Sequence, residues 1–167
     1  MKNLPDIYKC KVSVVGLGYV GLPIAIEIDK IKKCFVSGKK IKRNIVGFDI
    51  DQSRIDELNN GFDRTNEIKS KELIKAKNLI FSTSESELLD SNVFVITVPT
   101  PIDEFKNPNL NYVKKASSLV GKIISLSNKK NSSQTFPIVI FESTFYPGLT
   151  EEVCIPLIER EIKGKVN

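Results

Sequence analysis

The segment VSVVGLGYVG, residues 12–21, places an apolar run directly before three glycines, and an apolar-rich stretch of helical length, residues 20–31, follows. The glycines follow the pattern G-x-G-x-x-G, which at a strand-to-helix junction permits a tight turn, close approach of a pyrophosphate and close packing of helix on strand. The first turn of such a helix offers N–H groups and a positive dipole end to the phosphates. We therefore predict a dinucleotide site here. Its candidate residues are Gly16, Gly18, Gly21 and, through their backbone amides, Tyr19 and Val20.

The rest of the chain repeats this alternation of apolar runs and helical segments. Parallel strands need long crossovers, usually helices, so the alternation predicts a mostly parallel sheet covered on both faces. We expect a Rossmann-type, doubly wound α/β fold that forms a single domain over residues 1–167. The expected strands are 12–15, 45–48, 79–82, 93–98 and 138–141.

Several residues are spaced as helix boundaries. Asp51 and Asn111 are expected N-caps, and Gly61 is expected to end the helix that Asp51 begins. Ser84 and Glu87 have the spacing of a capping box for a short helix. The lysine-rich segment 32–43 and the polar segment 125–134 are expected to be loops.

Composition excludes several classes of protein. The 167 residues include no histidine and three cysteines without a C-x-x-C pair, which argues against a metal site, a disulfide framework or a histidine-dependent catalytic triad. No apolar stretch has the length of a membrane span, and the start lacks a secretory signal, so we expect a cytoplasmic protein without a membrane partner. The net charge of +5 comes largely from segment 32–43, which we interpret as a solvated loop and not as a nucleic-acid site.

A carboxylate at the end of the second expected strand completes the dinucleotide pattern. Asp49 occupies this place and is predicted to accept hydrogen bonds from the adenosine ribose hydroxyls. Its distance from the glycines is longer than usual, and the insertion 32–43 accounts for the excess. The alternative is that Asp49 only caps the next turn, but Asp51 can fill that role. A carboxylate repels the 2′-phosphate of NADP, so NAD is the expected cofactor, while nearby Arg54 is a further cofactor-binding candidate that argues for the phosphate.

Three further segments are not required by a generic dinucleotide-binding domain. They are GFDIDQSRIDELNNGFDRT at 47–65, VPTPID at 98–103 and FESTFYPGLTEEVCIP at 141–156. Together with GLGYVGLP at 16–23, they resemble the UDP-glucose/GDP-mannose dehydrogenase family, over residues 11–159. Their wording is most similar to the branch that acts on UDP-N-acetylhexosamines.

The resemblance implies an NAD-binding domain of an enzyme that oxidises the C6 alcohol of a UDP-sugar to a carboxylate with two NAD. It implies that Thr100 contacts the cofactor near the nicotinamide and that Thr144 positions a water at the reaction centre and lies near the cofactor. The alternative for both threonines is a hydroxyl that bonds local backbone in a turn. Glu142 is either a catalytic residue of the site or a carboxylate at a helix start.

The family's reaction passes through a thiohemiacetal on a cysteine that belongs to a later domain. Cys10, Cys34 and Cys154 do not fit that role, so we expect a fragment that binds NAD without turnover, from a full-length protein that is a homo-oligomer. One alternative is a stand-alone NAD-binding sensor or regulatory module. Another is a generic dehydrogenase of small molecules, which leaves the VPTPID and EST segments unexplained.

Overall fold

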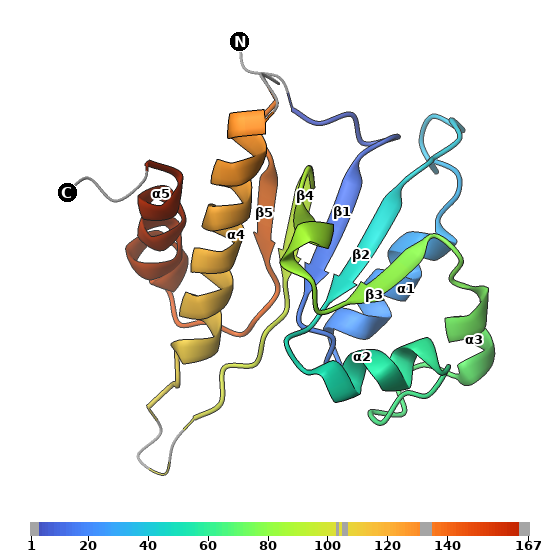
Figure 1. Ribbon diagram of the computed structural model, residues 1–167, viewed down its shortest axis with the longest axis horizontal. Coiled ribbons are helices and arrows are strands. Elements are labelled where there is room, and N and C mark those ends of the chain that lie inside the picture. Colours follow the sequence, from blue (N-terminus) through green and yellow to red (C-terminus); the bar gives the residue numbers. More distant parts are fainter. Residues whose placement is uncertain (1–3, 103, 105–106, 131–134, 164–167) are drawn as a thin grey trace.

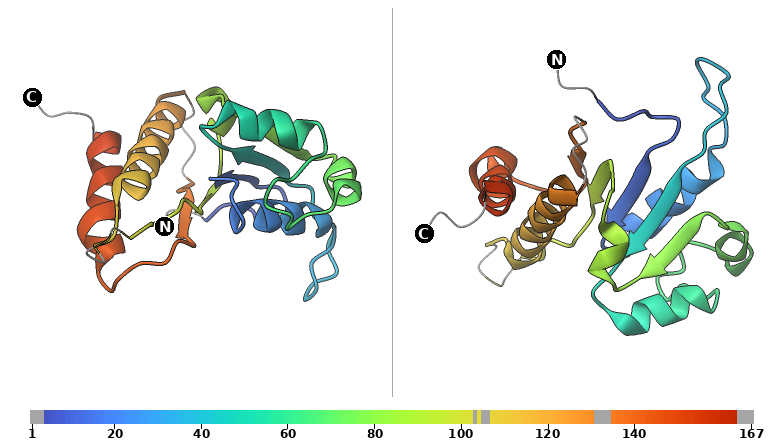
Figure 2. Two further views of the ribbon diagram at one scale, coloured as in Figure 1. Left: turned by 90° about the horizontal axis from the view of Figure 1, so that it is seen from below. Right: turned by 45° about the horizontal axis from the view of Figure 1, so that its top comes forward.

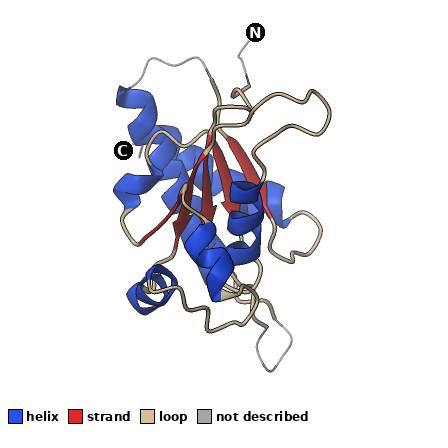
Figure 3. Cartoon of the chain, turned by 90° about the vertical axis from the view of Figure 1, so that its right-hand side faces the viewer, coloured by secondary structure: helices blue, strands red, loops and turns tan. Residues whose placement is uncertain are grey.

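The computed structural model describes residues 4–102, 104, 107–130 and 135–163. Its centre is one sheet of five strands in the order β3-β2-β1-β4-β5, and every neighbouring pair is parallel. Figure 3 shows the strands flanked by helices. The Rossmann-type, doubly wound α/β fold is therefore confirmed. The strands are β1 (Lys11–Val15), β2 (Asn44–Phe48), β3 (Leu79–Ser82), β4 (Val93–Ile96) and β5 (Ile138–Phe141).

The helices connect these strands and cover both faces of the sheet (Figures 1 and 2). The helices are α1 (Gly21–Lys30), α2 (Gln52–Asn59), α3 (Ser70–Lys75), η1 (Glu85–Leu88), α4 (Asn111–Lys130), η2 (Thr150–Cys154) and α5 (Ile155–Lys163). Helices α1, α2 and α3 pack with one buried cluster, and η1, α4 and α5 pack with another on the opposite face. The π-helical turn η2 leads into α5, which packs against α4.

Alternation along β1 divides the core between the two faces. Val14 packs with Leu22 and Ile26 of α1, whereas Val15 packs with Val120 of α4. Leu22 and Ile26 are completely buried, and burial of side chains of this size stabilises a fold by roughly 2 kcal/mol each. The two clusters fix the sheet between the helices and so hold the carboxyl ends of the strands in place.

Two helix boundaries are confirmed. Asp51 caps α2 by accepting a hydrogen bond from the Ser53 amide at 2.9 Å. Gly61 follows α2 with φ of 75°, a conformation that suits glycine after a helix.

Other sequence predictions were wrong in detail. Ser84 makes no capping hydrogen bond to η1. Asn111 is not the N-cap of α4 but its first residue, and its amide donates to the Asn109 side chain at 3.0 Å. Helix α4 continues through residues 125–130, where a loop was expected. The helix is held there in part by Ser127, whose hydroxyl accepts from the Asp90 amide at 3.1 Å. Residues 131–134 of the expected loop lie outside the described part of the chain.

Segment 32–43 lies at the surface as expected, but it has a defined shape. Lys33 and Lys40 form an antiparallel bridge, and the Cys34 amide donates to the Lys39 carbonyl at 2.9 Å. The segment is therefore a short hairpin that projects from the body of the molecule (Figure 2, right). No helix in the described part of the chain is long and apolar enough to cross a membrane.

Candidate functional site

The glycine-rich turn follows β1, where the strand order reverses: β2 and β3 lie on one side of β1, and β4 and β5 lie on the other. Open α/β sheets bind ligands at this point, beyond the carboxyl ends of the strands. Gly16 follows β1 with φ of 96°, and its amide donates to the Phe48 carbonyl at 2.8 Å. A left-handed backbone at this place explains the first glycine of the pattern.

The other two glycines differ in what surrounds them. A Cβ atom at Gly21 would overlap the Gly16 carbonyl oxygen and the Thr97 hydroxyl, so Gly21 is needed for packing. A Cβ atom at Gly18 would meet no atom within 4 Å. Gly18 therefore faces open space over the turn, where a bound pyrophosphate needs close access to the backbone.

The amides of the turn are available to such a ligand. Within the described residues, the N–H groups of Gly18, Tyr19, Val20 and Gly21 have no hydrogen-bond acceptor. They stand at the start of α1, where the helix dipole is positive. Tyr19 is 68% exposed, and its unpaired amide is the group that it contributes to the turn. These groups fit the pyrophosphate of a dinucleotide.

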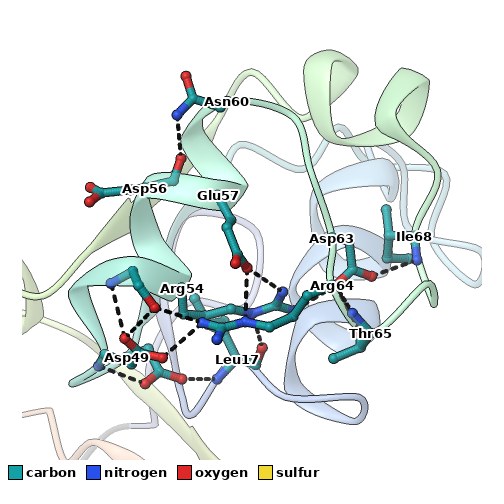
Figure 4. A network of polar contacts seen from close by, with 12 residues as sticks. Leu17, Asp49, Arg54, Asp56, Glu57, Asn60, Asp63, Arg64, Thr65 and Ile68 are labelled. Carbon is teal, nitrogen blue, oxygen red and sulfur yellow. Dashed lines mark hydrogen bonds and ion pairs between the residues drawn. The ribbon is translucent and has the colours of Figure 1, made fainter.

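Asp49 follows β2 directly and is tied to the glycine turn (Figure 4). Its Oδ2 atom accepts from the Leu17 amide at 2.8 Å, and its Oδ1 atom accepts from the Asp51 amide at 3.0 Å. The carboxylate therefore serves the local turn as well, while Asp51 caps α2. Each carboxylate oxygen accepts more than one hydrogen bond, so Asp49 retains acceptor capacity for ribose hydroxyls.

Arg54 lies behind the glycine turn. Its side chain is 3% exposed, its Nε atom donates to the Leu17 carbonyl at 2.9 Å, and its Nη2 atom donates to Asp63 at 2.7 Å. The structure thus gives the guanidinium a partner of opposite charge inside the protein. This buried position does not support a contact between Arg54 and the 2′-phosphate of NADP. The possibility of that contact was the reason to consider NADP from the sequence.

Asp63 is the most strongly hydrogen-bonded carboxylate of this network. It accepts from the Thr65 hydroxyl at 2.7 Å and from the Ile68 amide at 2.9 Å, in addition to Arg54. Burial opposes its ionisation, but the hydrogen bonds from Thr65, the Ile68 amide and Arg54 outweigh burial and lower its pKa to about 2. Asp63 is therefore charged at neutral pH, and it holds Arg54 in position beneath the turn.

A cavity of about 460 Å³ opens beside the turn. Apolar side chains from β1, β2 and α4 form much of its wall, which suits a planar base and a ribose. Asp49 and the second glycine of the turn, Gly18, are among its lining residues. Its polar and charged lining side chains are Asp49, Glu85, Thr97, Tyr112 and Lys115.

The VPTP and EST segments meet at the carboxyl ends of β4 and β5. The Thr100 hydroxyl donates to the Thr144 carbonyl at 2.9 Å, and the Ser143 hydroxyl donates to the Val98 carbonyl at 2.6 Å. The Thr100 hydroxyl thus bonds backbone, as one alternative expected, but the backbone belongs to the other motif and not to a local turn. The two predicted threonines are therefore brought together. Asp103, the last residue of VPTPID, lies outside the described residues.

Glu142 follows β5, and its amide donates to the Ile96 carbonyl at 2.9 Å. The next helical turn begins only at Thr150. The alternative role of Glu142 as a helix-start carboxylate is therefore wrong. Its exposed side chain lies at the edge of the sheet that carries the site.

Sequence reasoning missed Thr97 as a site residue. Its buried hydroxyl lies 2.7 Å from the Gly16 carbonyl and 3.1 Å from the Val15 carbonyl, and so braces the turn from β4. The expected strand 93–98 ends at Ile96 because the chain turns over the glycines from Thr97 onward. The one sign of this role in the sequence is that Thr97 places a hydroxyl directly after the apolar run of residues 93–96.

This sheet order, the glycine turn at the point of reversal and the carboxylate after β2 define a dinucleotide-binding Rossmann domain. A family model described as "UDP-glucose/GDP-mannose dehydrogenase family, NAD binding domain" matches residues 10–167. The chain therefore belongs to this family, as the resemblance of its motifs implied, and the cofactor of the matched domain is NAD.

Individual relatives agree with this assignment. The chain is 49% identical over 150 residues to UDP-N-acetyl-D-glucosamine 6-dehydrogenase of Pseudomonas aeruginosa, covering 90% of this chain and 31% of the relative. It is 40% identical to the enzyme of the same name from Salmonella typhi, covering 92% and 32%. The chain thus spans about a third of the length of these relatives.

Solved structures show the same fold. GDP-mannose dehydrogenase of Pseudomonas aeruginosa, in a ternary complex, superposes with a TM-score of 0.74 at 26% identity, over 92% of this chain and 33% of the other. A UDP-glucose dehydrogenase from Pyrobaculum islandicum gives a TM-score of 0.75 at 26% identity, over 95% and 34%.

Proposed function

We propose that this chain is the NAD-binding part of a nucleotide-sugar 6-dehydrogenase that oxidises the C6 alcohol of a UDP-N-acetylhexosamine to a carboxylate with two NAD. The observation that carries the proposal is the contact between Thr100 and Thr144, which joins the VPTP and EST motifs at the edge of the sheet that holds the glycine turn. The 49% identity to a UDP-N-acetyl-D-glucosamine 6-dehydrogenase supports the choice of sugar.

The residues of the turn hold the cofactor in this proposal. The amides of Gly18, Tyr19 and Val20 bind the pyrophosphate, and Asp49 accepts from the adenosine ribose hydroxyls. Asp49 also repels a 2′-phosphate, which gives the preference for NAD over NADP. Bound NAD supplies the hydride acceptor for the oxidation.

The second group of residues belongs to the reaction end. Thr100 contacts the cofactor near its nicotinamide, and Thr144 positions a water at the reaction centre, with Glu142 exposed on the same strand end. The thiol nucleophile of the family's reaction is provided by residues beyond this chain, in a protein that assembles as a homo-oligomer. Residues 1–167 then form one domain of that protein.

Two measurements test the proposal at separate levels. Calorimetric titration of the chain with NADH and with NADPH is expected to show binding of NADH and a clear preference for it. The protein extended to the full length of its relatives is then supplied with NAD and UDP-N-acetylglucosamine, UDP-N-acetylgalactosamine or UDP-glucose. We expect two NADH for each UDP-N-acetylhexosamine consumed and a uronic acid product.

The outcomes separate the alternatives. An extended protein that binds NADH but oxidises no UDP-sugar would support a regulatory module and overturn the enzymatic proposal. Faster oxidation of UDP-glucose than of either N-acetylhexosamine would overturn the substrate class and leave the dehydrogenase. A chain that does not bind NADH would contradict the roles given to the glycine turn.

A further inference from the structure

The hairpin of residues 32–43, named here the basic hairpin, lies at the opposite end of the sheet from the cofactor cavity. It joins the end of α1 to the start of β2, so it stands at the amino ends of the parallel strands. The glycine turn and Asp49 stand at the carboxyl ends. Figure 1 shows the basic hairpin projecting beyond the sheet, away from the edge that carries α2. A partner at the basic hairpin would therefore leave the cavity open.

The basic hairpin concentrates positive charge with little compensation. It contains six cations and no acidic residue. In the described part of the chain, Lys32 is the one member that forms an ion pair, with Asp29 at 2.9 Å. Four of the cations also line a cavity of about 340 Å³ at the base of the basic hairpin, together with the amides of Asn44 and Asn78. The cations of this cavity are Lys32, Lys40, Lys42 and Arg43.

The tip of the basic hairpin is apolar. Phe35 and Val36 are 94% and 97% exposed, and they are adjacent in the turn that the bridge between Lys33 and Lys40 closes. Adjacent, fully exposed apolar side chains are unusual on a protein surface that stays in water. Lysines on both sides of an apolar tip give the arrangement found in segments that bind at a lipid interface.

The tip is also held in shape. The Gly38 amide donates to the Cys34 carbonyl at 2.9 Å, and the Ser37 hydroxyl lies 3.0 Å from the Tyr8 hydroxyl. The Lys39 ammonium lies 5.4 Å from the centre of the Tyr8 ring. These contacts anchor the tip to the N-terminal segment, so that Phe35 and Val36 are presented without a further loss of backbone freedom.

We propose that the basic hairpin docks the protein reversibly onto a membrane surface rich in anionic phospholipid. Phe35 and Val36 enter the boundary between headgroups and acyl chains, and the surrounding lysines contact lipid phosphates. A convex tip has no groove to enclose a peptide. Phe35 and the neighbouring Tyr8, which is engaged by Ser37 and Lys39, do not provide the row of stacking side chains expected for single-stranded nucleic acid. Such a peripheral contact needs no membrane-spanning helix, and it differs from the absence of a membrane partner that we expected from the sequence.

Flotation with lipid vesicles tests the docking. Vesicles of phosphatidylcholine alone are compared with vesicles containing phosphatidylglycerol, at low and at high salt. Two variants remove the proposed determinants: Phe35→Ser with Val36→Ser at the tip, and Lys39→Glu with Lys40→Glu beside it. Two matched controls make the same kinds of change on α3, where Ile74 is 71% exposed: Ile74→Ser, and Lys71→Glu with Lys75→Glu.

We expect binding to phosphatidylglycerol vesicles that high salt weakens and that phosphatidylcholine vesicles do not show. Each lysine replaced by glutamate is expected to lower the partition coefficient by at least about five-fold, because a basic residue at an anionic surface contributes about 1 kcal/mol and the new carboxylate is repelled. The tip variant is expected to lose most of its binding, and the α3 variants are expected to bind as the parent does. Circular dichroism confirms that each variant is folded.

Equal binding to the two vesicle types would overturn the proposal, as would undiminished binding of the tip variant. A parallel titration with a fluorescent single-stranded RNA covers the other polyanion. Binding to this RNA in the absence of vesicle binding would assign the positive charge to a different partner and would also overturn the proposal.

Discussion

Asp49 Oδ2 lies 2.8 Å from the backbone nitrogen of Leu17, a contact that ties the end of β2 to the middle of the glycine-rich turn. The Leu17 carbonyl accepts a hydrogen bond from Arg54 Nε at 2.9 Å. Both backbone polar groups of Leu17 are thus held, its N–H group by the Asp49 carboxylate, which lines the cavity, and its carbonyl by the buried Arg54 guanidinium. The orientation of the amides that follow it depends on both contacts.

Asp49→Asn is expected to weaken NADH binding by about 10- to 100-fold, because the lost charge removes about 1.5–3 kcal/mol of charge-assisted hydrogen bonding to the ribose. Discrimination against NADPH should shrink, since the carboxylate no longer repels the 2′-phosphate. Calorimetric titration with both cofactors measures the two effects. Asp56→Asn, on the exposed side of α2, is a matched control that should bind as the parent does. An Asp49→Asn variant with the parent's preference would remove Asp49 as the selector.

Gly18→Val separates folding from cofactor binding. A Cβ atom at Gly18 meets nothing within 4 Å, so the variant should melt within a few degrees of the parent. The added side chain stands where the pyrophosphate must approach, so NADH binding should be lost. The comparison is Gly21→Ala, whose Cβ atom would overlap the Gly16 carbonyl and should lower the melting temperature as well. Retained NADH affinity in folded Gly18→Val would contradict the placement of the phosphates.

The sequence predicted the strands because each appears as a short apolar run, which is mostly buried in the central strands and only partly buried in the edge strands β3 and β5. It located Asp49 and Thr144 because parallel strands bring their carboxyl ends to one edge. Helix α3 escaped prediction because its six residues include a single buried side chain, Leu73, too few for a helical period. The buried position of Arg54 could not be predicted, because it depends on a salt bridge with Asp63, nine residues away. No local sequence pattern indicates whether the guanidinium lies beneath the glycine turn or faces the cofactor.

Arg54→Met is expected to destabilise the chain by about 3–5 kcal/mol, because it leaves the Asp63 carboxylate buried without its cation. Chemical denaturation measures the free energy of unfolding. The loss in Arg54→Met combined with Asp63→Asn should be smaller than the sum of the two single losses, because each single change already removes the ion pair. A double variant whose loss equals the sum of the single losses would show that the two side chains do not interact energetically.

Asp63 should also determine part of the response to acid. Its pKa is lowered from 3.8 to about 2 in the folded chain, so its contribution is fully present above pH 3.8 and is lost as the pH falls through about 2. The shift corresponds to roughly 2 kcal/mol of stability. In Asp63→Asn, the free energy of unfolding should change less between these two pH values than in the parent. An equally steep decline in both proteins would assign the acid sensitivity to other carboxylates.

Cys34 should be the reactive thiol of the chain. Hydrogen bonds from the Ser37 side chain and from the backbone of Ser37 and Val36 lower its pKa from 9.0 to about 7. Cys10 and Cys154 are buried, and burial raises the pKa of Cys154. Because the thiolate is the species that reacts, alkylation of the folded chain by iodoacetamide should rise with a midpoint near pH 7 and should modify Cys34 first.

Mass spectrometry of peptides identifies the modified cysteine, and the rate is followed as a function of pH. Ser37→Ala should move the midpoint toward the ordinary pKa of a thiol, because it removes the largest of the hydrogen bonds that stabilise the thiolate. Cys34→Ser should abolish the fast reaction and leave the two buried thiols unmodified until the chain unfolds. A midpoint that does not change in Ser37→Ala would contradict the role of the Ser37 hydroxyl and would leave the amides of Val36 and Ser37 and the Tyr8 hydroxyl to stabilise the Cys34 thiolate.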